Sequence, residues 1–161
     1  MPFTPFHFGP LVLLWALFLS LDLIALFAGA TLLDIEGLLY IFGIYPVLHG
    51  VLHSVLGATI VAIVATVLSY ELQNALDDSF KKRANIGNIF VSALFGSYSH
   101  IVLDAYLYGE MNLAWPLDYW NPFLGAYDYN TIILFCVLSF FAGAVILIAR
   151  NPFDKEKHKH H

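Results

Sequence analysis

Long apolar segments alternate with short polar breaks along almost the whole chain. The breaks carry the glycine, proline and polar residues typical of turns, at 43–46, 70–88 and 109–130. The apolar segments lack the alternating pattern of barrel strands, and backbone groups in lipid must be paired within the segment, so we expect membrane helices. Five such segments are present: 11–19, 23–42, 51–68, 89–108 and 132–148.

The first apolar segment is the only short one. At about 1.5 Å per residue, a helix over 11–19 crosses about half of a roughly 30 Å hydrocarbon core. It spans the membrane if the helix extends over 8–20, and otherwise it is a half-helix packed inside the bundle. The expected fold class is all-α, a polytopic membrane helix bundle. Residues 1–150 are expected to form a single membrane-embedded domain, followed by a polar cytoplasmic tail at 151–161.

The composition agrees with a membrane protein and excludes several other classes. Hydrophobic residues make up 60% of the 161 positions. Charged residues make up 12%, about half of the roughly 25% usual in soluble proteins. A water-soluble fold and a disordered chain are therefore excluded. With 7 Lys and Arg and a net charge of -5, we expect no nucleic-acid partner. The single Cys136 excludes an intramolecular disulfide and a cysteine metal site.

The distribution of cations predicts the orientation in the membrane. Lysine and arginine cluster after the third and fifth apolar segments, and two crossings separate these clusters, so both lie on one side. The positive-inside rule makes that side cytoplasmic, and with five full spans the N-terminus is then outside. The loop 109–130 then lies outside, and we interpret its aromatic residues as an interfacial anchor or as a lid over a lipid-facing site. The cations are Lys81, Lys82, Arg83, Arg150, Lys155, Lys157 and Lys159.

Seven ionisable residues in or beside the apolar segments are the candidates for function, because such groups are costly in a membrane. His49 and His53 are spaced i, i+4, as are His100 and Asp104, so each pair is expected to project from one helical face. Two facing pairs would present four ligands, as in metal sites of helix bundles. With the orientation above, all seven fall in the outer half of the bilayer, in a layer roughly 10 to 15 Å thick. They are His7, Asp34, Glu36, His49, His53, His100 and Asp104.

Each candidate also has a purely structural interpretation. A lone membrane histidine more often joins helices by hydrogen bonds than binds a metal, but the shared spacing and depth of this group favour a metal site. Asp34 and Glu36 lie two residues apart, about 200° around a helix. Either the helix is broken near Gly37, or one of the two supports a ligand without binding the ion itself. Asp22, at the opposite end of its segment, is expected to be a helix N-cap. The histidines of the tail, His158, His160 and His161, are excluded from the site.

The ligand types predict the metal and its chemistry. Imidazole and carboxylate without thiolate suit zinc first, with manganese or iron behind it. Four histidines and three carboxylates exceed the needs of one tetrahedral zinc, so we expect two or more ions. Such ions activate water and polarise a phosphoryl or acyl oxygen. Glu36 is the expected catalytic base. Ser54 is expected to bond to the backbone of its helix rather than to act as a nucleophile.

Several short motifs in this order resemble a known family. They are TPFHFGP, DIE at 34–36, HGVLHS at 49–54, and SHIVLD followed by Trp115-Pro116 and Asn121-Pro122. Together they resemble the YdjM-like (LexA-regulated) inner-membrane metal-dependent hydrolases over residues 2 to about 125. That family is distantly similar to zinc-dependent phospholipase C and to the zinc single-strand nucleases. Many members carry Thr in place of Ser54, and some carry Asp in place of Glu36. The resemblance implies ligands at His7, Asp34, His49, His53, His100 and Asp104, with Glu36 as a ligand or base.

Three functions remain open from the sequence. The first is a membrane-embedded metal-dependent hydrolase that cleaves a phosphoester of a lipid at the outer leaflet. The second is a metal-binding or metal-transporting membrane protein, although the inner half of the bundle is apolar apart from Asp22 and offers a transported ion no path. The third is a structural membrane subunit, which would bind no metal.

Overall fold

The computed structural model describes residues 4–76 and 85–150, and these residues form helices and loops without any strand. The all-α prediction is confirmed. Two 3-10 helices, η1 (Leu32–Asp34) and η2 (Val51–His53), interrupt the regular pattern. The α-helices are α1 (Thr4–Leu17), α2 (Leu23–Thr31), α3 (Ile35–Ile41), α4 (Val55–Ala75), α5 (Ile86–Ala105) and α6 (Tyr129–Arg150).

Four helical stretches are long and apolar enough to cross a membrane. They are α2 with η1 and α3, followed by α4, α5 and α6, with 19, 21, 20 and 22 residues. The α1 helix has 14 residues and rises about 21 Å, so it is too short to cross a core of about 30 Å. The helix ends at Leu17 and does not extend to residue 20, as the spanning alternative required. It begins seven residues before the predicted segment, and His7, expected just before the first helix, lies in its first turn.

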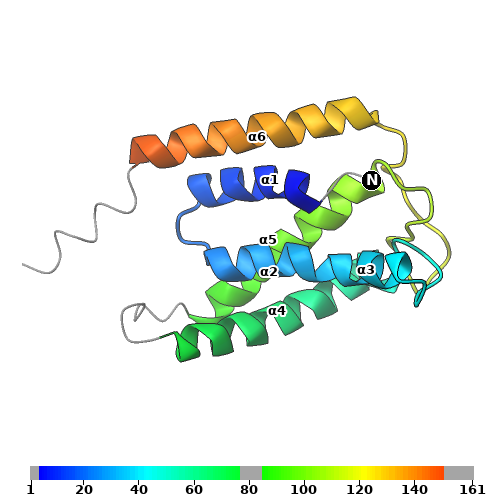
Figure 1. The fold of residues 1–161 in the computed structure, drawn as a ribbon, viewed down its shortest axis with the longest axis horizontal. Coiled ribbons are helices and arrows are strands. Elements are labelled where there is room, and N and C mark those ends of the chain that lie inside the picture. The colour runs from blue at the N-terminus through cyan, green and yellow to red at the C-terminus, as the bar shows by residue number, and fades with distance from the viewer. Residues whose placement is uncertain (1–3, 77–84, 151–161) are drawn as a thin grey trace, which may run out of the picture.

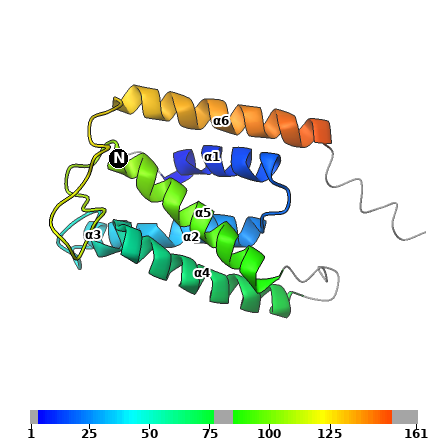
Figure 2. The same ribbon diagram turned by 180° about the vertical axis from the view of Figure 1, so that it is seen from behind.

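The helices run back and forth between two ends of the bundle (Figures 1 and 2). One end, called the α3 end from here on, holds the start of α1, α3, the C-terminus of α5 and the loops 42–54 and 106–128. The opposite end holds the C-termini of α4 and α6, including Arg150. The remaining cations used to predict the orientation, at 81–83 and 155–159, lie outside the described residues. Which end faces the cytoplasm therefore stays a prediction.

Close backbone contact between α2 and α5 depends on two glycines. A Cβ at Gly29 would lie 2.3 Å from the carbonyl oxygen of Ala93, and one at Gly96 would lie 2.0 Å from that of Leu26. Small residues at such positions let membrane helices pack tightly, since lipid supplies no hydrophobic driving force between them. This contact fixes the position of α5, which carries His100 and Asp104.

The short α1 helix packs against α6 in the same way. A Cβ at Gly9 would lie 2.0 Å from the carbonyl oxygen of Cys136, and one at Gly143 would lie 2.7 Å from the backbone nitrogen of Leu13. The Cys136 side chain itself is buried and free, as its lone occurrence predicted. The α6 helix therefore sets the position of α1 and, with it, of His7.

Arg150 caps the C-terminus of α1. Its guanidinium donates hydrogen bonds to the carbonyl oxygens of Ala16, at 2.6 Å, and Leu17, at 3.0 Å. The last carbonyls of a helix have no partner within the helix, so the last residue of α6 stabilises the end of α1.

Two local predictions, the N-cap at Asp22 and the bonding of the Ser54 hydroxyl to the backbone, are confirmed. Asp22 is the N-cap of α2, and its carboxylate accepts a hydrogen bond of 2.8 Å from the backbone nitrogen of Ala25. Ser54 is the N-cap of α4: its hydroxyl accepts from Gly57 N at 3.0 Å and donates to Val51 O at 2.7 Å. The Ser54 hydroxyl thus uses both its donor and its acceptor for backbone groups.

One prediction about helix boundaries is wrong. The third segment was expected to be helical from residue 51, but Ser54 adopts an extended conformation and α4 begins at Val55. His49 and His53 therefore do not share a helical face. In the second segment the helix changes to a 3-10 turn at η1, which ends at Asp34, whereas Gly37 lies inside α3; of the two alternatives for Asp34 and Glu36, the helix is thus not broken at Gly37.

Candidate metal centre

Four parts of the chain bring the seven predicted residues together at the α3 end. The α1 helix supplies His7, α5 supplies two residues, the loop 42–54 with η2 supplies two histidines, and the junction of η1 and α3 supplies two carboxylates. Six of the seven residues are buried, and the exception, the side chain of Asp34, is 30% exposed. Residues separated by up to 97 positions therefore form one polar cluster inside an apolar bundle.

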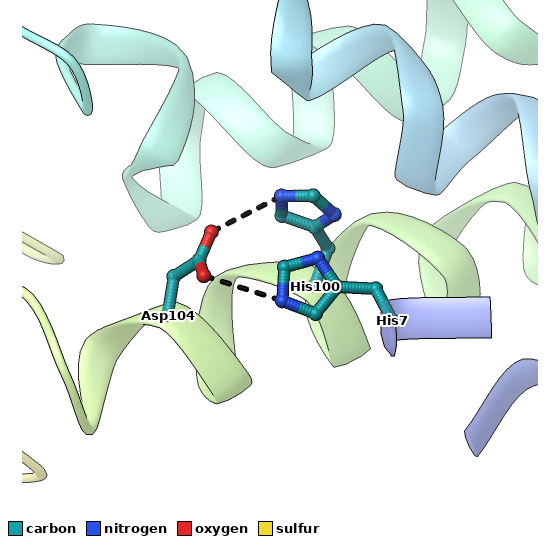
Figure 3. Close-up of side chains that lie close together, drawn as sticks. All are labelled: His7, His100 and Asp104. Carbon is teal, nitrogen blue, oxygen red and sulfur yellow. Dashed lines mark ion pairs between the residues drawn. The ribbon is translucent and has the colours of Figure 1, made fainter. Parts of the chain in front are cut away.

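Asp104 faces all four histidines of this cluster, two of which, His7 and His100, are shown with it in Figure 3. Its Oδ1 lies 3.3 Å from His7 Nε2, and its Oδ2 lies 3.1 Å from His100 Nε2. The same Oδ2 faces the Nε2 atoms of His49 at 3.6 Å and His53 at 3.9 Å. The i, i+4 pair of α5 is thus confirmed as a contact, and all four imidazoles turn a nitrogen toward one carboxylate.

Asp34 and Glu36 contact different histidines. Asp34 Oδ1 lies 3.6 Å from His100 Nε2. Glu36 Oε2 lies 2.9 Å from His53 Nδ1 and accepts a hydrogen bond from the backbone nitrogen of Gly50 at 2.9 Å, while its Oε1 accepts one from Leu52 at 2.9 Å. Asp34 ends η1 and Glu36 lies in the first turn of α3, and the two carboxylates contact different histidines of the cluster.

Three overlapping groups of side chains in the described residues could hold a metal ion, because their ligand atoms lie within 4.8 Å of one another. Each pair of groups has one residue in common, which is His53, His100 or Asp104, so neighbouring ion positions would share a ligand. Glu36 belongs to none of them, and the other six predicted residues all do. The groups are His7 with His100 and Asp104, Asp34 with His53 and His100, and His49 with His53 and Asp104.

Several buried polar atoms of the cluster have no hydrogen-bond partner. They are His7 Nδ1, Asp34 Oδ2 and His100 Nδ1, together with His53 Nε2 and His100 Nε2, which face Asp104 Oδ2 as ion pairs without forming a hydrogen bond. Leaving such atoms buried and unpaired is costly, and most buried polar atoms in folded proteins are paired. The donor set and its unpaired nitrogens fit a bound metal ion better than a self-contained hydrogen-bond network.

His49 contacts two side chains outside the predicted set. Its Nδ1 lies 3.0 Å from Glu110 Oε1, and its ring packs against that of Tyr108 with centroids 3.9 Å apart. Burial lowers the pKa of His49, although Asp104 and Glu110 act in the opposite direction. The imidazole is therefore neutral near pH 7 and keeps a lone pair for a ligand.

Sequence reasoning missed Glu110 and Tyr108. Glu110 lies six residues after Asp104, just beyond the predicted fourth segment, and was assigned to the outer loop. The available signal was its position, because it is an acidic residue next to a helix end that already carried two candidate ligands. For Glu36, the roles of ligand and base stay predictions, and its contacts favour a third role, that of orienting His53.

Comparisons of the chain with protein-family models, with curated proteins and with solved structures find no match. The resemblance to the YdjM-like family therefore stays a prediction.

Proposed function

We propose that the protein is a membrane-embedded metal-dependent hydrolase that cleaves a phosphoester of a lipid. The observation that carries the proposal is the set of buried, unpaired nitrogen and oxygen atoms on His7, Asp34, His53 and His100 within overlapping metal groups. In an apolar bundle, such atoms have few uses other than coordination.

The charge of the cluster supports two ions rather than one. Four carboxylates gather here, those of Asp34, Glu36, Asp104 and Glu110. Within residues 4–76 and 85–150, the only Lys or Arg is Arg150, at the opposite end of the bundle. Two divalent cations would balance four carboxylates, and the imidazole and carboxylate donors favour zinc.

The expected chemistry follows from the ligands. A divalent ion of this kind acts as a Lewis acid on a phosphoryl oxygen and lowers the pKa of water. Within the three metal groups, Asp34 is the exposed member, so an approaching substrate would meet this carboxylate first. His7, His49, His53, His100 and Asp104 would hold the ions from the buried side.

Aromatic side chains at the α3 end favour a lipid as the substrate. Tyrosine and tryptophan collect at the level of the lipid headgroups, where their rings meet both apolar and polar surroundings. A metal centre below such a layer would meet the ester linkages of lipids, and the predicted orientation places it in the outer leaflet. The exposed aromatic residues are Tyr40, Phe42, Trp115, Tyr119, Trp120, Tyr127 and Tyr129.

Metal transport, the alternative function, is less well supported. Beyond the cluster, α2, α4 and α5 meet in a core of buried apolar residues, and an ion crossing both leaflets would have to pass it. This core consists of Ala25, Ala62, Ala65, Ile89 and Ala93.

The proposal is tested by lipid hydrolysis in mixed micelles that contain zinc and a panel of phospholipids and lipid phosphates. We expect release of a phosphorylated headgroup or of phosphate, measured by mass spectrometry, and its loss with a chelator or in His100→Ala. Ser99→Ala is the matched control, because Ser99 lies on the same helix and its hydroxyl bonds only to Gly96 O at 2.9 Å. A protein that binds zinc but cleaves no lipid ester would refute the hydrolase and leave metal binding as the function.

A further inference from the structure

Two histidines of the cluster share an arrangement that the proposed function does not explain. The Nδ1 atom of His53 lies 2.9 Å from Glu36 Oε2, and the Nδ1 atom of His49 lies 3.0 Å from Glu110 Oε1. The two glutamates come from different parts of the chain, α3 and the loop 106–128. Each of these imidazoles therefore has a carboxylate on the nitrogen that points away from Asp104.

This arrangement determines which ring nitrogen carries the proton. An ionised carboxylate only accepts hydrogen bonds, so each Nδ1 is a donor and each Nε2 keeps its lone pair. Both Nε2 atoms face Asp104 Oδ2, His49 at 3.6 Å and His53 at 3.9 Å. His49, His53 and Asp104 form one of the three metal groups.

We propose that Glu110 and Glu36 are positioning residues that hold His49 and His53 with their Nε2 atoms turned toward one ion position beside Asp104. Carboxylates that accept a hydrogen bond from a ligating histidine fix its orientation and make it a better ligand. The inference rests on the proposed function only in that an ion occupies the group formed by His49, His53 and Asp104.

The loop holds Glu110 in place without help from an ion. Met111, the next residue, is fully buried, and Leu113 is 3% exposed in the same core cluster. Leu113 O accepts a hydrogen bond of 3.0 Å from the backbone nitrogen of Val55, at the start of α4. Asn121 Nδ2 donates to Ala105 O at 3.0 Å and so ties the loop to the end of α5. The backbone on either side of Glu110 is thus anchored to α4 and α5.

The two glutamates respond differently to substitution by glutamine. Glu110 uses one oxygen for His49, and its side chain is 40% exposed, so glutamine can turn its carbonyl oxygen to the histidine. Glu36 uses both oxygens, for Gly50 N, Leu52 N and His53 Nδ1. A glutamine there turns an NH2 group toward at least one of these donors. If that donor is His53 Nδ1, the ring can accept from the NH2 group only after its proton moves to Nε2, which removes the lone pair. If that donor is Leu52 N, the segment that carries His53 loses one of its backbone hydrogen bonds.

The test measures zinc affinity by competition with a chelator, together with the visible absorption spectrum of the cobalt-loaded protein. We expect Glu110→Ala to weaken zinc binding by about 10 to 100-fold and to change the cobalt spectrum. Glu110→Gln should restore most of the affinity and the spectrum. Asp118→Ala, an exposed carboxylate of the same loop, is the control for the lost charge and should change neither.

Glu36→Gln distinguishes positioning from catalysis. If Glu36 is a positioning residue, the zinc affinity of Glu36→Gln should fall at least as far as that of Glu110→Ala. As the catalytic base predicted from the sequence, it should keep the metal and the cobalt spectrum and lose about 10² to 10⁴ in turnover. Retention of metal in Glu36→Gln would therefore overturn the positioning role of Glu36.

For Glu110, wild-type zinc affinity and an unchanged cobalt spectrum in the alanine variant would overturn the inference and leave the proposed function standing. An equal loss in Glu110→Ala and Glu110→Gln would also overturn it, because charge rather than the hydrogen bond to His49 would then explain the effect. A wild-type protein that binds neither zinc nor cobalt would refute the proposed function itself.

Discussion

Gly9→Ala tests whether the packing of α1 against α6 sets the geometry of the metal centre. The added Cβ would lie 2.0 Å from the carbonyl oxygen of Cys136, and real Cβ contacts are essentially never shorter than 3.0 Å. The blocking atom is backbone, so α1 must move away from α6 by about 1 Å. His7 lies two residues earlier on the same helix, and its Nε2 is 3.3 Å from Asp104 Oδ1. A displacement of this size is a large fraction of that distance and so changes how His7 and Asp104 would share an ion.

Two effects should follow from Gly9→Ala. Overpacking of a tight contact costs about 1 to 3 kcal/mol, so the free energy of unfolding should fall by that amount. A misplacement of about 1 Å in a reacting site costs about 100-fold in rate, so hydrolysis should fall more steeply than stability alone predicts. Thermal unfolding in detergent and lipid hydrolysis at a temperature well below the Tm measure the two effects separately.

Gly87→Ala is the matched control. Gly87 lies in the first turn of α5, at the opposite end of the bundle, and a Cβ there would lie 3.6 Å from Asn85 Oδ1, an ordinary contact. It should therefore change neither the Tm nor the rate by more than a small amount. A Gly9→Ala protein with the same Tm and rate as this control would refute the claim that α6 positions His7.

The remaining predictions concern ligands, orientation and the α1 cap. His53→Ala and His100→Ala should each lose metal and activity together, whereas His160→Ala in the tail should change neither; metal analysis of the three variants checks this, and equal effects would show that the site is wrongly assigned. A cysteine placed at Asn121 should be labelled from outside intact cells and one at Ser79 should not, because the cation bias of the loops predicts these sides; the reverse result would refute the orientation. Arg150→Met removes two charged hydrogen bonds to the end of α1, so thermal unfolding should show a loss of about 1 to 3 kcal/mol; an unchanged Tm would mean that this cap does not stabilise α1.

The parts of the site that depend on local periodicity could be predicted from the sequence. His100 and Asp104 are spaced i, i+4 inside one regular helix, and they contact each other as expected, at 3.1 Å. The Asp22 cap could also be predicted, because an acidic residue directly before an apolar helix satisfies the first backbone donors.

The positions of His49 and His53 could not be predicted in the same way. Their i, i+4 spacing suggested a helix, but Glu36 accepts hydrogen bonds from the backbone nitrogens of Gly50 and Leu52 and holds this segment outside α4. These contacts join residues 14 and 16 positions apart, and local spacing carries no information about them. The two histidines still face Asp104, because the loop 42–54 with η2, rather than α4, positions them there.

Glu110 escaped prediction for a related reason. Its contact with His49 spans 61 positions and depends on how the loop 106–128 folds back over the bundle. The anchors of that loop, buried Met111 and Leu113, look like ordinary loop residues in the sequence. A carboxylate next to a predicted site becomes informative only when the path of the surrounding loop is known.

The central claim is that the clustered histidines and carboxylates hold metal ions, and elemental analysis of the purified protein tests it most directly. The protein would be purified without chelator from cells supplied with zinc, manganese and iron, next to His100→Ala as the site variant and Ser99→Ala as the control. We expect at least about one equivalent of metal per chain, chiefly zinc, in the wild type and in Ser99→Ala. In His100→Ala we expect this metal to be lost. Wild-type protein with less than about a tenth of an equivalent of any transition metal would contradict the account.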